Sequence, residues 1–331
     1  MADYKNIKGF NIQYLDSDPP NPIEGQMWFN STSQTLKGAE VGGVPAGTWA
    51  SGGNLNTARY AGAQGFGIQT AALATGGIPS PAFTELYNGT SWTEVNDLNT
   101  GRNSFSGFGT TIAGLVTGGE TTANITNVES WDGTNWTEIT EIPTITRSMS
   151  AFGIQTSGII AGGKAPANTV VGNAYSWNGT SWTAISSLGQ SRSDAMASGT
   201  SNLNGILAGG ETPPATTYAQ TESWDGSAWS ELSDLNTARA YGGASRNSDG
   251  EMLVFGGAPS AASPLYANTE SFDGTSWTEV NDLATARRSL SSAGASGSSA
   301  LAAGGYNGTA TVDITEEWTA PDILVKTFTT S

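Results

Sequence analysis

The 331-residue sequence contains no cysteine and no histidine. Without these two residue types, the chain cannot form disulfides, thiolate nucleophiles, catalytic triads that use either side chain, or most zinc sites. The absences therefore remove the common routes to metal and redox chemistry. We expect no metal site and no cofactor.

Charge is also scarce and one-sided. Charged residues make up 13% of the chain, and 29 Asp and Glu against 13 Lys and Arg give a net charge of −16. This acidic balance disfavours nucleic acid and anionic membrane surfaces as partners. No apolar run is long enough to span a bilayer, and the N-terminal residues lack the apolar segment of a signal peptide. We expect no membrane insertion.

Glycine, by contrast, is abundant, and it accompanies a repeated phrase. Residues 126–136 read as strand, tight turn and strand, with an Asp-Gly dipeptide where glycine accepts φ > 0 without steric cost. A sixth copy begins at Glu316 and stops before its turn, while Thr48-Trp49 is a strand fragment with no turn before it. The other copies lie at residues 85–92, 175–182, 222–229 and 270–277.

Four positions recur along the chain and define six repeats. A Trp opens each repeat, in steps of 43 to 48 residues, at Trp49, Trp92, Trp136, Trp182, Trp229 and Trp277. An Arg follows it, at Arg59, Arg102, Arg147, Arg192, Arg239 and Arg287. A Gly-Gly pair comes next, beginning at Gly76, Gly118, Gly162, Gly209, Gly256 and Gly304. A Glu precedes the turn, at Glu85, Glu129, Glu222, Glu270 and Glu316, and Tyr175 replaces it in the third repeat.

Each repeat reads as four strands. They are the Trp strand, a strand of small residues after the Arg, an apolar strand that ends at Gly-Gly, and a strand carrying Glu-x-aromatic. Four strands repeated six times predict an all-β fold, a six-bladed β-propeller. The Gly-Gly after an apolar strand, the aromatic before the turn and the Trp after it resemble the kelch-repeat family across residues 48–319. The resemblance implies the propeller fold and says little about function.

Residues that repeat are most simply structural. We interpret the tryptophans as core between blades, in preference to ligand platforms. We likewise prefer a structural contact of the Arg with the Glu or with a carbonyl over a ring of ligand-binding arginines. The strand after the Arg is expected to be innermost, because its small side chains allow close approach at the axis.

Counting strands predicts how the propeller closes. The sixth repeat ends at Trp318-Thr319, and residues 48–52 are expected to supply its missing strand and so pair two exposed edges. We therefore divide the chain into an N-terminal attachment segment with a small β-hairpin (1–47), the propeller closed by an N-terminal strand (48–319), and a C-terminal strand or tail (320–331). Residues 323–328 are predicted to pair with the N-terminal segment or with a neighbouring subunit.

Loop lengths vary on one predicted face. From the second Gly to the aromatic residue the separation runs from 10 to 15 residues, against 15 to 17 from the Arg to Gly-Gly. Insertions on one face of a repeat array often mark its binding face. Tyr218, Tyr266 and Tyr306 lie in these loops and are candidate ligand-binding residues, because a Tyr ring can stack on a sugar and its hydroxyl can form hydrogen bonds. Solvated loops without a ligand are the alternative.

The N-terminal phrase at residues 24–30, followed by Leu36-Lys37-Gly38, resembles segments found near the N-termini of tailed-phage tail-fibre and virion structural proteins. An ordinary β-hairpin also explains it. The resemblance implies that the terminal segments bind other virion proteins, with several copies per particle. Candidate partner-binding residues are Met27, Trp28, Phe29, Leu324 and Phe328.

The sequence therefore predicts a phage virion structural protein, a tail fibre or other surface appendage, assembled in the host cytoplasm. Its termini would attach it, and the propeller would face outward toward a host-surface glycan or receptor. One alternative is a glycan-binding or glycoside-processing propeller, and another is a cellular kelch-type interaction module. A glycosidase needs two carboxylates in a pocket, yet most acidic residues repeat and Asp194 is an exception. We expect no enzymatic activity and no catalytic residues.

Overall fold

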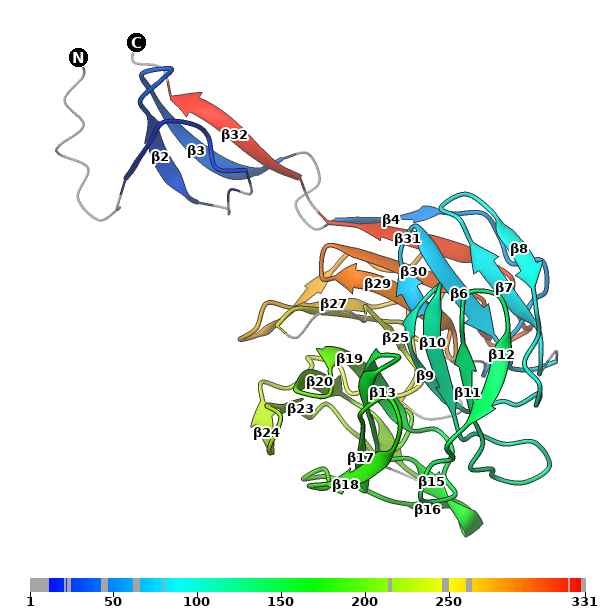
Figure 1. Ribbon diagram of the computed structural model, residues 1–331. Helices are drawn as coiled ribbons and strands as arrows, with labels where there is room; N and C mark the ends of the chain where they lie inside the picture. Colours follow the sequence, from blue (N-terminus) through cyan, green and yellow to red (C-terminus); the bar gives the residue numbers. More distant parts are fainter. Residues whose placement is uncertain are drawn as a thin grey trace. The chain divides into compact units, whose positions relative to one another are not determined.

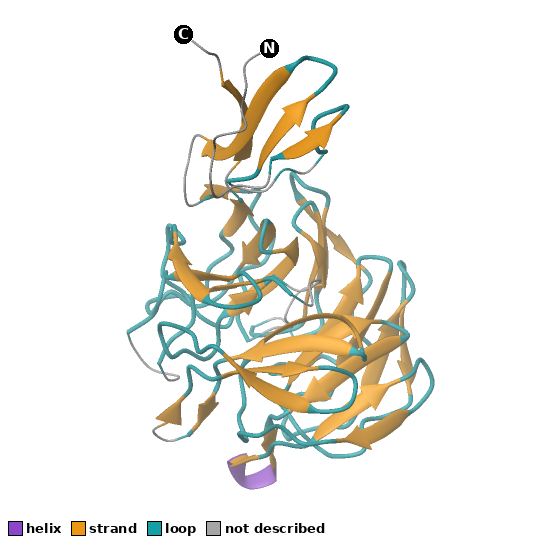
Figure 2. Cartoon of the chain, turned by 90° about the vertical axis from the view of Figure 1, so that its left-hand side faces the viewer, coloured by secondary structure: helices purple, strands orange, loops and turns teal. Residues whose placement is uncertain are grey.

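The computed structural model describes residues 12–20, 22, 25–42, 47–61, 66–79, 81–213, 216–245, 250–259, 264–320 and 322–328. The chain divides into a terminal unit, Met1–Thr48 with Ala320–Ser331, and a repeat region, Trp49–Thr319. The described residues form strands and turns with no α-helix, and the one helical element is the 3-10 turn η1 (Pro166–Asn168) (Figure 2). None of them forms a helix long and apolar enough to cross a bilayer.

The repeat region consists of propeller-like, four-stranded sheets, which confirms the all-β prediction (Figure 1). The first two sheets are β5 (Phe66–Ile68), β6 (Ala71–Thr75), β7 (Thr84–Tyr87), β8 (Trp92–Val95), and β9 (Ser106–Thr110), β10 (Ala113–Thr117), β11 (Val128–Trp131), β12 (Trp136–Ile139). The third and fourth are β13 (Ser150–Ile154), β14 (Ser157–Ala161), β17 (Ala174–Trp177), β18 (Trp182–Ile185), and β19 (Met196–Ser201), β20 (Asn204–Ala208), β23 (Thr221–Trp224), β24 (Trp229–Leu232). The fifth and sixth are β25 (Gly243–Ala244), β26 (Met252–Phe255), β27 (Thr269–Phe272), β28 (Trp277–Val280), and β29 (Ser291–Ser296), β30 (Ser299–Ala303), β31 (Thr315–Thr319), β4 (Thr48–Ser51).

Two short ribbons extend loops of the third and fourth sheets. They are β15 (Lys164–Ala165) with β16 (Thr169–Val170), and β21 (Glu211–Thr212) with β22 (Thr216–Thr217). Both ribbons begin directly after a Gly-Gly pair. These two loops thus carry their own hydrogen-bonded structure.

The terminal unit is a separate sheet of four strands. Its members are β1 (Gln13–Leu15), β2 (Met27–Asn30), β3 (Thr35–Gly42) and β32 (Asp322–Phe328), in that order. β2 and β3 form the predicted antiparallel hairpin, and β3 pairs with β32, so the C-terminal tail pairs with the N-terminal segment. Trp28 is buried, and its indole N–H donates to Asp18, whose carboxylate also accepts bonds from Asn30 and Lys37.

The first strand of each sheet contacts its counterparts in the neighbouring sheets. The contacts run from β5 to β9, β13, β19, β25 and β29, and β29 contacts β5. Apolar clusters fill the space between sheets, and one of them joins Tyr87 and Trp92 of the first sheet to Ala293 and Leu301 of the sixth. In the sixth sheet β4 lies beside β31, and the rings of Trp49 and Trp318 are 5.5 Å apart.

The repeated tryptophans lie between sheets, as predicted. Four of them donate an indole hydrogen bond to a threonine of the preceding sheet at 3.0–3.3 Å, namely Trp49 to Thr269, Trp92 to Thr315, Trp136 to Thr84 and Trp277 to Thr221. The second and third sheets have Val128 and Ala174 at the threonine position, so Trp182 and Trp229 of the following sheets donate to backbone carbonyls instead. The tryptophans therefore stabilise contacts between neighbouring sheets.

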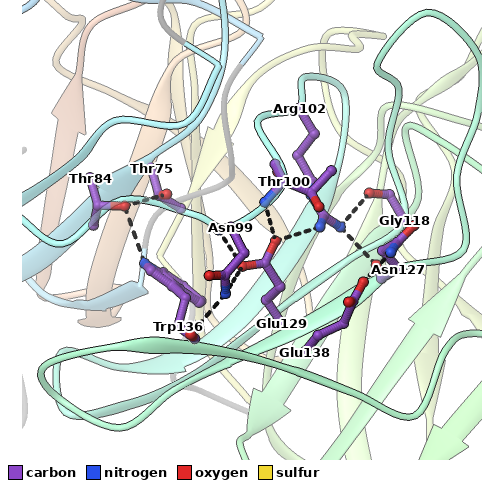
Figure 3. A network of polar contacts seen from close by, with 10 residues as sticks. All are labelled: Thr75, Thr84, Asn99, Thr100, Arg102, Gly118, Asn127, Glu129, Trp136 and Glu138. Atoms are coloured by element: carbon purple, nitrogen blue, oxygen red, sulfur yellow. Dashed lines mark hydrogen bonds and ion pairs between the residues drawn. The ribbon is translucent and has the colours of Figure 1, made fainter.

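The repeated Arg and Glu also form the structural contact that we preferred. In the second sheet the buried Arg102 donates to Glu129 at 2.6 Å and to the carbonyls of Asn127, Gly118 and Thr100 (Figure 3). The other carboxylate oxygen of Glu129 accepts the backbone N–H of Asn99. The same buried pair occurs as Arg59–Glu85, Arg192–Glu222, Arg239–Glu270 and Arg287–Glu316.

The third repeat departs from the sequence-based alignment. The carbonyl of the repeated Arg accepts the N–H of the second Gly of a Gly-Gly pair, and in the third repeat Thr146 has this role. A Cβ on Gly118 would lie 2.5 Å from that carbonyl oxygen, which explains why glycine is required there. Assigning Arg147 to the Arg position is therefore wrong by one residue. Thr146 and Tyr175 together replace the buried ion pair in this repeat.

Candidate ligand-binding site

Six residues at equivalent places in the repeats form a series of backbone hydrogen bonds at the inner ends of the sheets. Each donates its N–H to the carbonyl of the preceding one at 2.6–3.0 Å, and the series runs through Ala61, Ser104, Ser148, Asp194, Tyr241 and Ser289 and returns to Ala61. All six are non-glycine residues with φ of 52–61°. Such backbone conformations are costly and tend to occur where a site must be held in one geometry.

A cavity of about 410 Å³ lies over these six residues. All six line it, and further lining residues come from the position that follows the repeated Arg and from the position that follows Gly-Gly. These two positions are joined across each repeat by single β-bridges, such as Asn103 with Glu120 and Arg147 with Lys164. The cavity therefore lies on the side of the repeat region to which the Gly-Gly loops belong.

The side chains around this axial cavity do not repeat. After the repeated Arg, or Thr146, come Tyr60, Asn103, Arg147, Ser193, Ala240 and Arg288. After Gly-Gly come Ile78, Glu120, Lys164, Glu211, Ala258 and Tyr306. The frame is thus repeated, whereas the side chains that it presents differ from one repeat to the next.

Lys164 is the centre of one charged cluster in the cavity. Its ammonium lies 2.7 Å from Asp194, 3.1 Å from Glu211 and 3.3 Å from the hydroxyl of Tyr241, which itself donates to Glu211. Burial lowers the pKa of Lys164, but the charges of Asp194 and then Glu211 more than offset this, so its pKa is raised overall. Burial, followed by the charge of Asp194, raises the pKa of Tyr241. The cluster therefore holds a protonated Lys against two carboxylates.

Arg147 forms a second, more accessible ion pair. It donates to Glu120 at 2.9 Å and to the side chain of Asn168 at 2.6 Å. Because Arg147 follows Thr146, its side chain lies at the cavity and not in the buried position of the other repeats. The third repeat thus contributes both Arg147 and Lys164 to the cavity.

Arg288 is the one cation of the axial cavity that lacks an acidic partner within the described ranges. Its guanidinium lies 5.7 Å from the ring centre of Tyr241 and 5.4 Å from that of Tyr306. Its Nε atom is buried and has no hydrogen-bond partner. A buried donor without a partner is costly. The residue as a whole is half-buried and lines the cavity, so its terminal guanidinium nitrogens are available to an acceptor that enters.

A second cavity of about 290 Å³ adjoins the first. Ile78, Asn103 and Glu120 line both. The remaining walls are Gly77, Pro79, Pro81, Gly101 and Thr121, which carry no charge. A ligand larger than the axial cavity can therefore continue past Asn103 into this side cavity.

The three predicted ligand-binding tyrosines have different surroundings. Tyr218 and Tyr266 lie over the repeated Arg192 and Arg239, with ring centres 5.8 and 5.5 Å from the guanidinium carbons, so both contact the structural arginines. Tyr306 lies beside the cavity, against Arg288 and 5.8 Å from the ring of Tyr60. The structure therefore brings one of the three to the candidate site.

The predicted partner-binding residues belong to the terminal unit. Trp28 is fully buried, so it supports the sheet of that unit and offers no surface of its own. Met27 and Phe29 are partly exposed on β2, where Phe29 stacks on Tyr14 at 4.8 Å. Leu324 and Phe328 lie on β32, but their side chains fall outside the described residues.

Sequence reasoning missed the cluster of Glu120, Arg147, Lys164, Glu211 and Arg288, and it used Asp194 only as an isolated carboxylate. Asp194 precedes β19 and joins the Lys164 cluster. The sequence does contain an indication of this cluster: at the positions that follow the repeated Arg and Gly-Gly, charged residues occur in some repeats and not in others. Nowhere in the described ranges do three acidic side chains form a group that could hold a metal ion.

Comparisons with known proteins identify the fold and no family. No family model matches the sequence, and no curated protein is similar to it. The solved structure of YjhT is similar in fold, with a TM-score of 0.69 at 14% sequence identity over 82% of this chain and 99% of that chain. A likeness at this identity supports the propeller-like fold alone.

Proposed function

We propose that this protein is a structural protein of a phage virion, attached by its terminal unit, whose repeat region binds a host-surface glycan in the axial cavity. We further propose that the repeat region is a closed, six-bladed, kelch-type β-propeller. The observation that carries the binding function is the gathering of charged and aromatic side chains that do not repeat around one cavity of a repeated frame.

Three features support closure with six blades. The backbone hydrogen bonds from Ala61 to Ser289 return to their starting residue, and the contacts of the inner strands return from β29 to β5. The pattern of Trp–Thr bonds also continues from the sixth sheet to the first, where Trp92 donates to Thr315. In such a ring β4 completes the sixth blade and pairs with the edge that β31 would otherwise expose.

Binding is favoured over hydrolysis by the state of the carboxylates. Asp194 and Glu211 are both held by Lys164, and Glu120 is held by Arg147. A glycosidase needs one carboxyl group free to donate a proton and a second to act as base or nucleophile. The attachment function is supported by the terminal unit, which combines the N-terminal phrase with β32 in one sheet.

Binding to an array of bacterial surface polysaccharides tests this function, with N103W as the matched variant. Asn103 lines both cavities, and an aromatic residue is compatible with its place because Tyr60 holds the equivalent position in the first repeat. We expect the full chain to bind a subset of the polysaccharides and N103W to lose this binding while keeping the wild-type melting temperature. Binding to none of them, or equal binding by N103W, would contradict the proposal.

Electron cryo-microscopy of the assembled particle tests attachment. We expect the terminal unit against other virion proteins and the axial cavity facing solvent. A particle in which the Gly-Gly loops contact the virion and the terminal unit is free would have the proposed orientation reversed.

A further inference from the structure

We propose that the ligand is an acidic oligosaccharide of at least two sugar units, with a carboxylate on Arg288 and the next sugar in the side cavity beyond Asn103. This inference rests on the proposed glycan-binding function and names the chemical class of the ligand. It depends on the distribution of charge in the axial cavity and on the connection between the two cavities.

The chain concentrates its few available cations at this site. Five of its 13 Lys and Arg occupy the buried Arg–Glu pairs, and three of the remaining eight line the axial cavity. Arg147 pairs with Glu120 and Lys164 pairs with both Asp194 and Glu211, whereas Arg288 has no acidic partner among the described residues. In a protein of net charge −16, a guanidinium held in a cavity without a partner favours an anion brought by the ligand.

The charge balance favours a carboxylate over a phosphate monoester. A guanidinium presents a planar pair of donors that matches a carboxylate in a bidentate geometry. Arg288 can pair with one negative charge, while the cavity's three cations and the three carboxylates beside them, Glu120, Asp194 and Glu211, already sum to zero. A phosphate monoester carries about −1.5 to −2 at neutral pH, and its excess charge would face Glu120 and Asp194, which line the cavity.

The remaining walls favour a saccharide as the carrier of that carboxylate. Tyr60 and Tyr241 line the cavity with aromatic rings, of which that of Tyr241 is contacted by Arg288 and Lys164, while Ser104, Ser148 and Ser289 lie along its floor. Aromatic faces combined with many small polar groups suit a ring that has apolar C–H faces and hydroxyl edges. A purely apolar ligand would leave the polar groups of this floor unpaired.

The two joined cavities favour an extended ligand. Their volumes, about 410 and 290 Å³, together fall inside the usual range for ligand sites, about 300–1,000 Å³. Asn103 and Glu120 stand where the cavities meet and can bond to hydroxyls of both sugars. The side cavity has no cation of its own, so the sugar that occupies it is neutral or directs its charge to solvent.

The test combines a change in the ligand with a change in the protein. Trisaccharides of galacturonate and of mannuronate and a glucuronate–N-acetylglucosamine tetrasaccharide are each compared with the same oligosaccharide after reduction of its carboxylates to alcohols. The full chain is compared with two variants, R288N and R288K. Asparagine is chosen because Asn103 occupies the position of Arg288 in the second repeat. Dissociation constants are measured by isothermal titration.

We expect the wild type to bind at least one acidic oligosaccharide, and carboxyl reduction to weaken it about tenfold or more, the usual scale for a hydrogen bond to a charged group. R288N should bind the acidic and reduced forms equally, because the carboxylate has lost its partner, and R288K should keep an intermediate preference. Since the effect is a ratio between two ligands on one protein, a folding defect cannot imitate it. Galacturonate alone should bind at least about tenfold more weakly than its trisaccharide.

Equal binding of acidic and reduced forms by the wild type would overturn the carboxylate assignment, and so would a preference that survives in R288N. Equal affinity for mono- and trisaccharide would overturn the extended site. If only neutral polysaccharides bind and N103W abolishes that binding, the acidic ligand is wrong while the proposed function stands. If nothing binds, both fail.

Discussion

The buried Arg–Glu pairs and the charges of the axial cavity show two uses of ion pairs in one frame. Arg102 and Glu129 have no solvent exposure, and the same buried pair recurs in four other repeats, although Nε of Arg287 and Oε1 of Glu316 lack a hydrogen-bond partner in the sixth. In the cavity the side chains of Arg147 and Glu120 are 23% and 31% exposed, and no pair recurs. Charges that repeat are therefore buried and paired within the protein, whereas Arg147 and Glu120, which do not repeat, remain within reach of a ligand.

The third repeat lacks the buried Arg–Glu pair and contributes two cations, Arg147 and Lys164, to the cavity. Thr146 and Tyr175 replace the buried pair, and neither carries a charge. Tyr175 instead bonds to Thr144 at 2.6 Å, and Thr146 donates to the carbonyl of Thr144. The two positions of the pair have thus changed together, which avoids a buried charge without a partner.

The largest expected effect comes from removing β4, because the sheets that carry both the buried pairs and the cavity charges depend on it. A chain of residues 48–319 keeps β4, whereas a chain of 53–319 lacks it and leaves β31 without its neighbour. The shorter chain also loses Trp49, which packs on Phe255 and Trp318. We expect it to be less stable by more than the ~3–5 kcal/mol of a buried Trp-to-Ala change, on the order of 10 °C in melting temperature.

The two chains differ by five residues, so the loss is specific to the β4 strand, and calorimetry of both provides the measurement. Equal melting temperatures would mean that β4 does not complete the sixth sheet in solution. The buried pairs and the cavity charges would then belong to a series of sheets that does not close into a ring.

The next largest effect is expected from a substitution that breaks one buried Arg–Glu pair. E129A leaves the Arg102 guanidinium buried without its carboxylate and leaves the N–H groups of Asn99 and Thr100 without their acceptor. We expect a loss of about 3–5 kcal/mol in the free energy of unfolding, the range for breaking a buried pair. Guanidinium unfolding followed by tryptophan fluorescence measures it.

The third repeat supplies the matched control for this prediction. R102T/E129Y transfers Thr146 and Tyr175 to the second repeat and removes both charges together. We expect this double variant to be more stable than E129Y, because no unpaired guanidinium remains. If R102T/E129Y is as unstable as E129Y, the uncompensated charge is not the source of the loss.

Most of the fold could be predicted because its residues repeat. The spacing of Trp, Gly-Gly and Glu predicted the four-stranded sheets, and the Asp-Gly turns predicted hairpins such as β11–β12, where Asp132 accepts two backbone N–H groups. The Arg position of the third repeat was misassigned because Arg147 is adjacent to the true position, and a spacing cannot detect a shift of one residue. Only the backbone hydrogen bond to Thr146 does so.

The candidate site was harder to predict for the same physical reason. Its residues come from separate repeats, with Lys164 lying 47 residues from Glu211 along the chain. No local pattern connects them, and the loop tyrosines that drew attention include two that serve the buried arginines. In a chain of repeats, the equivalent positions at which the residue differs between repeats are the ones that indicate a binding site.

The smallest expected effect is the loss of stability on replacing Lys164, which compares a cavity ion pair with the buried Arg–Glu pairs. K164M removes the cation between Asp194 and Glu211, whose side chains are 13% and 6% exposed and can turn to water in the cavity. We expect a loss of about 1–2 kcal/mol near pH 8, clearly below that of E129A.

The pH dependence of this loss provides an independent check. The pKa of Lys164 is raised above its ordinary 10.5, so its contribution is complete below that pH and disappears as the pH rises through the folded-state value. The stability difference between Lys164 and Met should therefore shrink at pH 11 and above. Burial raises the pKa of Tyr241, so this group adds its own loss of stability above its ordinary pKa of 10.0, and Arg288 faces it. Both proteins are therefore compared in a Y241F background. A difference that stays constant from pH 8 to 12, or equals that of E129A, would place Lys164 with the buried structural pairs.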